Sequence, residues 1–354
     1  MGWRFVIADQ AGRSIGEPHA SSRRVSFGVS RVCTAGFRIT DQDPMWDRIE
    51  AGEAMLKVYD SAGSLRLYGP VVADEETGRG QGAEVQVAAA DLAWRFGKRY
   101  VAKDTTGVGT TYTSQDSAQI ALTALAAVNA DGATGVQAGN ADACVTRTLT
   151  VLWKKYLDLL SELSAIEGSY EWGLRYVDGS EGAAPSAYLD LLARWGTDRT
   201  SGSGAVFLEY GCGRRNCGGY SRARTIDQLA TDVWVLGGGG TVVTRAENAG
   251  ARTSFGRHED VISYGDITTA SLLDALAAAH VAIRRQPRQI WNLTPFPKLA
   301  PRYGVDYTVG DLIVGRVAVR GQTRVAGILR AWAVDVDIDE LGNEKPTLRL
   351  TPEA

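Results

Sequence analysis

The chain has 354 residues, of which 44% are hydrophobic and 22% are charged, and its formal net charge is −3. This length suggests about two or three packed units with a sizeable core. The charge balance excludes a chain-wide positive field that would attract nucleic acid or anionic membranes. The chain has no run of about 18 apolar residues, which is the length needed to span a bilayer. Arg4 and Asp9 interrupt the apolar core that a signal peptide would need near the start. We therefore expect a soluble protein without a cleavable export signal.

Residues 1–104 read as strands and turns, which is typical of an antiparallel meander or barrel. In the hairpin around Asp60–Gly63, Leu56 and Val58 fall on one face and Lys57 and Tyr59 on the other. Because side chains alternate along a strand, we expect one buried and one solvated face.

In residues 105–195 the apolar residues recur at the three- and four-residue spacing of helices, and the pattern predicts two helices and a hairpin inserted between β regions. The first helix has Thr113 or Ser114 as its cap and Asp116 in its first turn. The second begins near Thr150 and ends at Gly168, and its apolar side consists of Leu152, Tyr156, Leu159, Leu160, Leu163 and Ile166.

Residues 196–354 return to strands, interrupted by a helix over 268–286 that ends at Pro287. We expect its Leu272, Leu276 and Ile283 side to pack on the wall of a barrel. The chain is thus predicted to be mainly β with an α+β insertion. The pattern predicts a first barrel over 1–104, the insertion over 105–195 and a second barrel over 196–354, because closure removes unpaired strand edges.

The usual signatures of chemistry are incomplete in this chain. Asp335, Asp337 and Asp339 begin like a calcium loop, but Glu340 and Pro346 stand where that loop needs Gly and Glu. Alternation with valine and isoleucine favours a strand with an acidic outer face. The glycines at 237–240 lack the Lys-Ser/Thr of a phosphate loop and favour a flexible hairpin turn.

No nucleophile, base or metal set stands out either. His258 is followed by Glu259 but lacks the second histidine of a zinc protease helix, and His19 and His280 are the other two histidines. The thiols of Cys33, Cys144, Cys212 and Cys217 are too few for a disulfide scaffold, although Cys212 and Cys217 could bridge or hold a metal with distant ligands. We expect no catalytic, cofactor-binding or metal-binding residue, no cofactor, and no enzyme activity.

Three segments, taken in order, resemble a known family. They are 58–101, a hairpin followed by a strand that runs into Asp91-Leu92, then 254–295, a polar strand leading into an Ala/Leu helix, and 307–350, with its Gly310-Asp311 step, Arg330 and closing hairpin. Together they are similar to the tail hub, or baseplate hub, proteins of tailed bacteriophages, in the form found in phages of actinobacteria.

The resemblance implies a structural protein of the virion tail tip, synthesised in the host cytoplasm. Family members form a trimeric ring in which each chain supplies two barrels related to the tail tube, so that three chains meet a six-fold ring. The implied partners are further copies of the chain, the distal tail protein ring, the tail tube, the C-terminus of the tape measure protein and other tail tip or fibre proteins. DNA would be present only in transit through the channel.

Two other functions remain open. A host-surface or carbohydrate-binding tail module would use clustered surface aromatics, whereas the nine tryptophans here are spread from Trp3 to Trp332. A hydrolase is disfavoured because the nucleophile and base spacings are missing.

Overall fold

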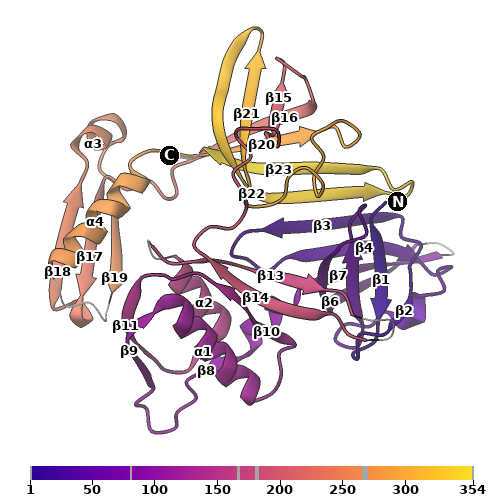
Figure 1. Ribbon diagram of the computed structural model, residues 1–354, viewed down its shortest axis with the longest axis horizontal. Helices are drawn as coiled ribbons and strands as arrows, with labels where there is room; N and C mark the ends of the chain where they lie inside the picture. Colours follow the sequence, from indigo (N-terminus) through magenta and orange to yellow (C-terminus); the bar gives the residue numbers. More distant parts are fainter. Residues whose placement is uncertain (1, 80–81, 166–167, 180–182, 265–269, 353–354) are drawn as a thin grey trace. The chain divides into compact units, whose positions relative to one another are not determined.

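A computed structural model describes residues 2–79, 82–165, 168–179, 183–264 and 270–352. The chain is mainly β, as the sequence predicts, and it contains two compact units (Figure 1). The larger unit comprises Met1–Arg147, Val151–Tyr220 and Asn292–Ala354, and the smaller comprises Thr148–Thr150 and Ser221–Trp291. The boundaries expected at 104/105 and 195/196 stay predictions.

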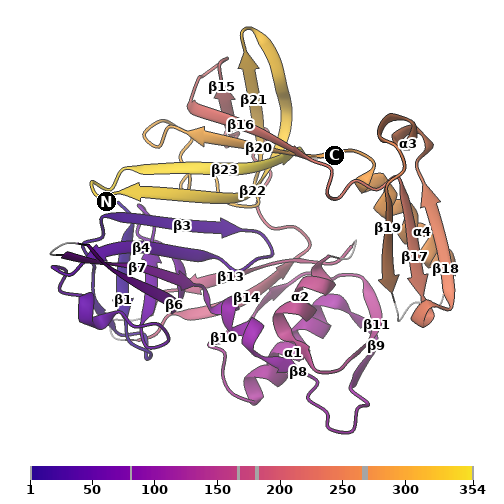
Figure 2. The same ribbon diagram turned by 180° about the vertical axis from the view of Figure 1, so that it is seen from behind.

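A long, mostly antiparallel sheet dominates the larger unit, and its strands come from both ends of the chain (Figures 1 and 2). Its N-terminal strands are β1 (Arg4–Ala8), β2 (Ser14–Gly16), β3 (Ser22–Gly28), β4 (Thr34–Thr40), β5 (Met55–Tyr59), β6 (Leu65–Arg79) and β7 (Gly82–Ala90). Its later strands are β15 (Phe207–Tyr210), β16 (Cys217–Thr225), β20 (Arg288–Pro295), β21 (Leu312–Val319), β22 (Gln322–Asp339) and β23 (Glu344–Pro352). The part of β16 from Ser221 on and the part of β20 up to Trp291 are counted with the smaller unit. The short 3-10 helix η1 (Trp46–Arg48) lies between β4 and β5.

The sheet contains two five-stranded modules with the same strand order, and β1, β2 and β15 extend it beyond them. In the N-terminal module the strands pair in the order β3-β4-β7-β6-β5, and in the C-terminal module they pair in the order β16-β20-β23-β22-β21. Chain order within each module matches as well, so β6 and β22 are equivalent strands. The modules are joined where β22 pairs with β3.

Residue-level details support this equivalence. The ladder of β6 with β7 has a register shift between Val71 and Ala73, and the ladder of β22 with β23 has one between Ala331 and Ala333. At both places the residue before the shift is held by a preceding segment. Val71 N donates to Ala54 O and Val71 O accepts from Gly52 N, both at 2.9 Å, while Ala331 N donates to Asp311 O at 2.9 Å and Ala331 O accepts from Gly310 N at 2.7 Å. Val71 therefore corresponds to Ala331.

The expectation of two closed barrels is not met. Among the described strands the pairing runs as an open path from β16 to β2, with β21 and β15 branching from β22, and no ring closes. The reason is that β6 and β22 are longer than β5 and β21, the strands that precede them in their hairpins, so the second half of each continues beyond that partner. Residues 333–339 of β22 leave β21 and pair with β3 of the other module, so the two modules form one extended sheet.

Lys57 also departs from expectation. Its side chain lies on a strand of which four residues in succession are buried, and its own exposure is 5%. Lys57 pairs with Val6 of β1, and its Nζ lies 3.5 Å from the Ser14 hydroxyl. The hairpin of β5 and β6 therefore has no fully solvated face.

Between these two groups of strands the chain forms helices and three small sheets. The elements are η2 (Leu92–Lys98), β8 (Tyr100–Val101), β9 (Thr110–Asp116), α1 (Ser117–Ala130), β10 (Val136–Ala141), β11 (Thr146–Val151), β12 (Lys154–Lys155), α2 (Tyr156–Ser164), β13 (Glu171–Val177) and β14 (Ser186–Leu192). The expected hairpin is confirmed, since β13 and β14 pair antiparallel.

Both helices begin later than expected. The cap of α1 is Asp116, whose side chain accepts from Ala118 N and Gln119 N, whereas Thr113 and Ser114 belong to β9. A carboxylate satisfies the free amides of a first turn better than a hydroxyl two residues earlier can. The second helix begins at Tyr156, because the preceding residues extend as β11 and β12, and Leu152 is exposed.

Helix α2 packs through four buried side chains, those of Tyr156, Leu159, Leu160 and Leu163. Their burial contributes on the order of 8 kcal/mol before the entropy of ordering. The Tyr156 hydroxyl donates to Ala121 O of α1 at 3.1 Å, and its ring meets Phe96 edge-on with centroids 4.8 Å apart. Ile166, expected on the same side, lies outside the described residues.

The smaller unit is a three-stranded sheet covered by a helix. Its elements are β17 (Asp232–Gly237), η3 (Gly238–Gly240), β18 (Val242–Glu247), α3 (Ala249–Phe255), β19 (Glu259–Tyr264) and α4 (Ala270–Arg284). β17 pairs antiparallel with β18 and parallel with β19. The glycines at 237–240 form the turn between β17 and β18, which confirms the hairpin reading.

Helix α4 packs on this small sheet and not on a barrel wall. Its Leu273, Ala277 and Val281 are buried against Val233 and Val235 of β17. Leu276 is buried as expected, but Ile283 is 76% exposed. Ile283 lies two residues from Val281, which places it about 200° around the helix from the buried stripe. The side chain of Leu272 lies outside the described part of the chain. None of the described helices has the length and apolar character needed to cross a membrane.

Candidate functional site

One face of the long sheet is polar across both modules. Alternation places the buried side chains of β3, β4, β7, β22 and β23 on one face and polar side chains on the other. We call this second face the polar face. It consists of Arg24, Ser26, Thr34, Arg38, Thr40, Glu75, Thr77, Glu84, Gln86, Asp335, Asp337, Asp339, Lys345, Thr347 and Arg349.

The strand register brings these residues into contact across the junction of the modules. Asp337 faces Arg24, and Asp335 faces Ser26. Arg24 lies 3.7 Å from Asp335 and 3.6 Å from Asp337, while Arg349 donates to Asp335 at 2.8 Å. The acidic outer face expected for this strand is confirmed. Asp335 and Asp337 are paired with arginines of neighbouring strands, whereas Asp339 accepts hydrogen bonds from Asn343.

Asp335 stays ionised despite its burial. Burial alone would raise the pKa of this carboxyl, but hydrogen bonds from Ser26 and Arg349 and the charges of Arg349 and Arg24 lower it below the ordinary value. The network therefore fixes a charged pair at the seam between β22 and β3.

Two grooves lie along the polar face. One is lined by residues of β4, β6 and β7, including Arg38, Glu75, Thr77 and Glu84. The other follows the seam and is lined by residues of β3, β22 and β23, including Arg24, Asp337 and Lys345. The groove along the seam is lined by both cations and carboxylates, whereas the other groove has Arg38 together with Asp41, Glu75 and Glu84. No aromatic side chain belongs to the polar face as defined. Such a surface offers neither a stacking platform nor an excess of positive charge to a polyanion.

The three histidines are not among the residues of the polar face. His258 Nε2 lies 3.0 Å from Phe255 O, His280 Nε2 lies 2.6 Å from the Tyr264 hydroxyl, and His19 is exposed on a loop. In the described ranges no three His, Cys, Asp or Glu side chains form a group that could hold a metal ion. All four cysteines are free thiols.

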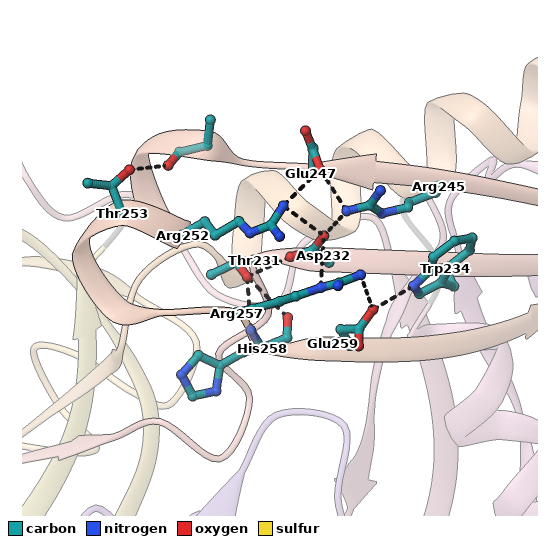
Figure 3. Close-up of polar contacts among 11 residues, drawn as sticks. Thr231, Asp232, Trp234, Arg245, Glu247, Arg252, Thr253, Arg257, His258 and Glu259 are labelled. Atoms are coloured by element: carbon teal, nitrogen blue, oxygen red, sulfur yellow. Dashed lines mark hydrogen bonds and ion pairs between the residues drawn. The ribbon is translucent and has the colours of Figure 1, made fainter.

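The most concentrated charge cluster surrounds Asp232 in the smaller unit (Figure 3). Asp232 is fully buried, and Arg245, Arg252 and Arg257 converge on its carboxylate. Thr231 donates to Asp232 Oδ2 at 2.9 Å. Burial would raise the pKa of Asp232, but the hydrogen bonds from Arg245 and Thr231 lower it.

The same arginines are also engaged with carboxylates at the surface. Arg245 and Arg252 pair with Glu247, and Arg257 pairs with Glu259, so three carboxylates match three guanidinium groups. The cluster therefore joins β17, β18, α3 and β19 into one structure and leaves no charge for a ligand. Nothing in the sequence marks Asp232, because its partners lie at irregular spacings.

Comparisons with known proteins fit the observed fold. No protein-family model and no curated protein sequence matches the chain. The structure is similar over 100% of the chain to the tail protein from Neisseria meningitidis MC58, with a TM-score of 0.65, 13% identity and 97% of that protein covered. The chain has the fold of this tail protein.

Two further solved structures share this fold. The 43 kDa tail protein of prophage MuSo2 from Shewanella oneidensis has a TM-score of 0.65 and 12% identity, with 98% of the present chain and 97% of the other covered. The E. coli c3393 protein, a component of the type VI secretion system described as similar to the T4 tail proteins gp27 and gp5, has a TM-score of 0.55 and 11% identity, covering 98% and 77%. At these identities the likeness concerns the fold.

Proposed function

We propose that the chain is a structural protein of a bacteriophage tail that forms a trimeric hub ring at the tail tip. The observation that carries this proposal is the pair of modules with equal strand order, joined edge to edge in one sheet. Three chains would present six equivalent modules, which is what a six-fold tube or distal tail ring requires of a three-fold partner. The fold of solved phage tail proteins supports the same reading.

The polar face supplies the wall of the channel in this proposal. Arg24 and Arg349 pair with Asp335 and Asp337 within the sheet, and carboxylates are at least as numerous as cations on this face, so DNA in transit meets no net positive surface to which it would bind. The C-terminus of the tape measure protein would occupy the channel before ejection. The distal tail ring, the tail tube and tip or fibre proteins would contact the rims, in a virion assembled in the host cytoplasm.

This function is tested by the number of copies and their place in the particle. Mass photometry of the purified full-length chain should give a trimer at high concentration, and electron microscopy of tails should place the protein at the tip as a ring of three chains. Six copies per tail, or a location along the tube, would contradict the proposal. The protein should also give no clearing in zymograms of host cell walls, because its proposed role requires no hydrolysis.

One observation favours host-surface binding as a second candidate. Tyr100 and Trp153 are 40% and 51% exposed and lie edge to face with ring centroids 6.5 Å apart, and Val108 nearby in sequence is 72% exposed. Paired exposed rings can stack on sugars. Binding of purified chain to host-wall glycans that is abolished by Trp153→Ala, without change in oligomeric state, would support this candidate. Absence of binding leaves the hub as the remaining function.

A further inference from the structure

Large apolar side chains gather at one exposed place in the larger unit. Val108 is 72% exposed, Trp153 51%, Leu152 41% and Tyr100 40%. The segments that carry them are neighbours, because β8 pairs with β12 and β9 pairs with β11. A Cβ added to Gly109 would lie 3.2 Å from Leu152 Cβ, so the loop that carries Val108 passes beside Leu152. We call the four exposed residues the apolar patch.

The backbone holds Trp153 in its exposed position. Trp153 has a φ of +46° and Ala102 a φ of +51°, a region that residues with a side chain seldom adopt. Trp153 N donates to Ala102 O at 3.2 Å, and the indole Nε1 donates to Asp104 O at 2.9 Å. Backbone strain of this kind persists only where the surrounding structure imposes it, and it is common at functional sites. The exposure of Trp153 is therefore fixed by the fold.

The loop that carries Val108 is fixed as well. The Asp104 carboxylate accepts hydrogen bonds from Thr106 N at 2.8 Å, Val108 N at 3.0 Å and Gly109 N at 2.9 Å. Three amides on one carboxylate order the loop before any partner arrives. The patch is thus presented without the entropy cost of ordering a flexible loop on binding.

Lysines surround the apolar patch, although the chain uses arginine far more often. Of its 38 basic residues only 7 are lysines. Four of these lie within three residues of Tyr100 or Trp153, namely Lys98, Lys103, Lys154 and Lys155. Lys155 pairs with Tyr100 across the ladder of β12 with β8, so these two exposed side chains share a face. Asp131 and Glu162 pair with two of the lysines, whereas Lys98 and Lys155 have no carboxylate partner within the described ranges.

This composition fits a lipid surface better than a protein or a sugar. Protein interfaces are enriched in aromatic side chains but depleted in lysine. Tryptophan, tyrosine and lysine together are typical of the boundary between lipid headgroups and acyl chains, where the ammonium groups reach the headgroups. A sugar would need polar partners beside the rings, but the indole N–H of Trp153 already donates to Asp104 O.

We propose that the apolar patch inserts into the interfacial layer of a bilayer that contains anionic lipids. Val108, Leu152 and Trp153 enter the region between headgroups and acyl chains, and Lys155 lies at a lipid phosphate. The contact is peripheral, because only a loop and the ends of short strands take part. The inference adds a lipid partner to the proposed hub function and does not depend on the number of copies in the ring.

Flotation of the purified full-length chain with vesicles tests the apolar part of this contact. The chain should float with vesicles of phosphatidylcholine and phosphatidylglycerol. Val108→Asp should weaken partitioning about tenfold, because the burial of a valine in an apolar phase is lost. The matched control is Ile283→Asp, which alters a residue of similar exposure, 76%, on α4 and should float like the unchanged chain.

The lysine is tested by changing its charge. Lys155→Glu should weaken binding to the vesicles with phosphatidylglycerol but not to vesicles of phosphatidylcholine alone, since the attraction depends on anionic headgroups. Lys298→Glu, at an exposed lysine outside the patch, should alter neither. Lipids brominated on their acyl chains should quench tryptophan fluorescence less in Trp153→Phe than in the unchanged chain.

Equal partitioning of Val108→Asp and Ile283→Asp would overturn the inference, and so would failure of the unchanged chain to float with either kind of vesicle. A changed oligomeric state of Val108→Asp without vesicles would overturn it by assigning the patch to a contact between proteins. Host-wall glycan binding that Val108→Asp abolishes, without vesicle binding by the unchanged chain, would assign the patch to sugars. None of these results decides the hub proposal, which the copy number and the place in the tail test separately.

Discussion

Arg330 of β22 forms a two-pronged ion pair with Glu171 of β13, although the two residues lie far apart in the sequence. The guanidinium also donates to Gly310 O at 3.2 Å and to Trp195 O at 2.9 Å, and Trp195 N donates to Glu171 Oε2 at 2.6 Å. Arg330 is 8% exposed. This pair ties the C-terminal module to the hairpin of β13 and β14.

Removing one member of this pair should destabilise the protein strongly. Arg330→Met leaves the Glu171 carboxylate half-buried without its partner, and breaking such a pair costs about 3–5 kcal/mol. Urea unfolding of the larger unit measures the loss. Arg13→Ala, which breaks an exposed pair with Asp9, is the control and should cost less than about 1 kcal/mol. Equal losses in the two variants would show that the buried pair has no special role.

Gly196 should tolerate no side chain. Its φ is +94°, and a Cβ would lie 2.1 Å from the carbonyl carbon of Gly310. Gly63 has a similar φ of +83° but open space around it, so Gly63→Ala isolates the backbone strain of about 1–2 kcal/mol. Gly196→Ala should cost about 1–3 kcal/mol more, because the backbone at Gly310 must move. Thermal unfolding of both variants provides the comparison, and matching losses would contradict the close approach.

Asp91 should make stability depend on pH. Burial raises the pKa of this carboxyl to about 7, against hydrogen bonds from Cys33 N and Ala93 N that favour the ionised form. Because the folded pKa lies above the ordinary value of 3.8, the contribution of Asp91 is fully present below about pH 4 and is lost as the pH rises through 7. In Asp91→Asn this decline should disappear from the free energy of unfolding measured between pH 4 and pH 8. Parallel curves for the two proteins would refute the assignment.

Local sequence patterns predict most helices and strands, but they do not predict which strands pair with each other when the partners lie far apart in the sequence. Alternation and turn residues correctly indicate the hairpin of β13 and β14 and the turn at 237–240, because both depend on neighbours in sequence. The departure of β22 from β21 after Arg330 depends on a strand near the N-terminus, and no local period encodes that choice. The 3.6-residue period likewise indicates α4, but it does not indicate which sheet the helix packs against. Ile283 is exposed because the buried side of the helix runs through Leu273, Ala277 and Val281, and Ile283 points to the other side.

The residues of the polar face differ in the same way in what the sequence reveals about them. The acidic alternation at Asp335, Asp337 and Asp339 is visible in the sequence. The arginine partners of Asp335 and Asp337 come from β3 and β23 and become apparent only from the register. Burial of Lys57 is likewise set by β1, which covers the strand from outside the hairpin.

The segment between β16 and β20 is a position at which one inserted domain could be replaced by another. In the N-terminal module the short stretch 29–33 joins β3 to β4, but in the C-terminal module the strands of the smaller unit and α4 stand at the equivalent position. A tight turn from Thr225 to Arg288 would therefore complete the C-terminal module without altering its strand order. Evolution can replace, lengthen or lose the intervening segment as a cassette, and a protein engineer could insert a foreign domain there while keeping every ladder of the long sheet.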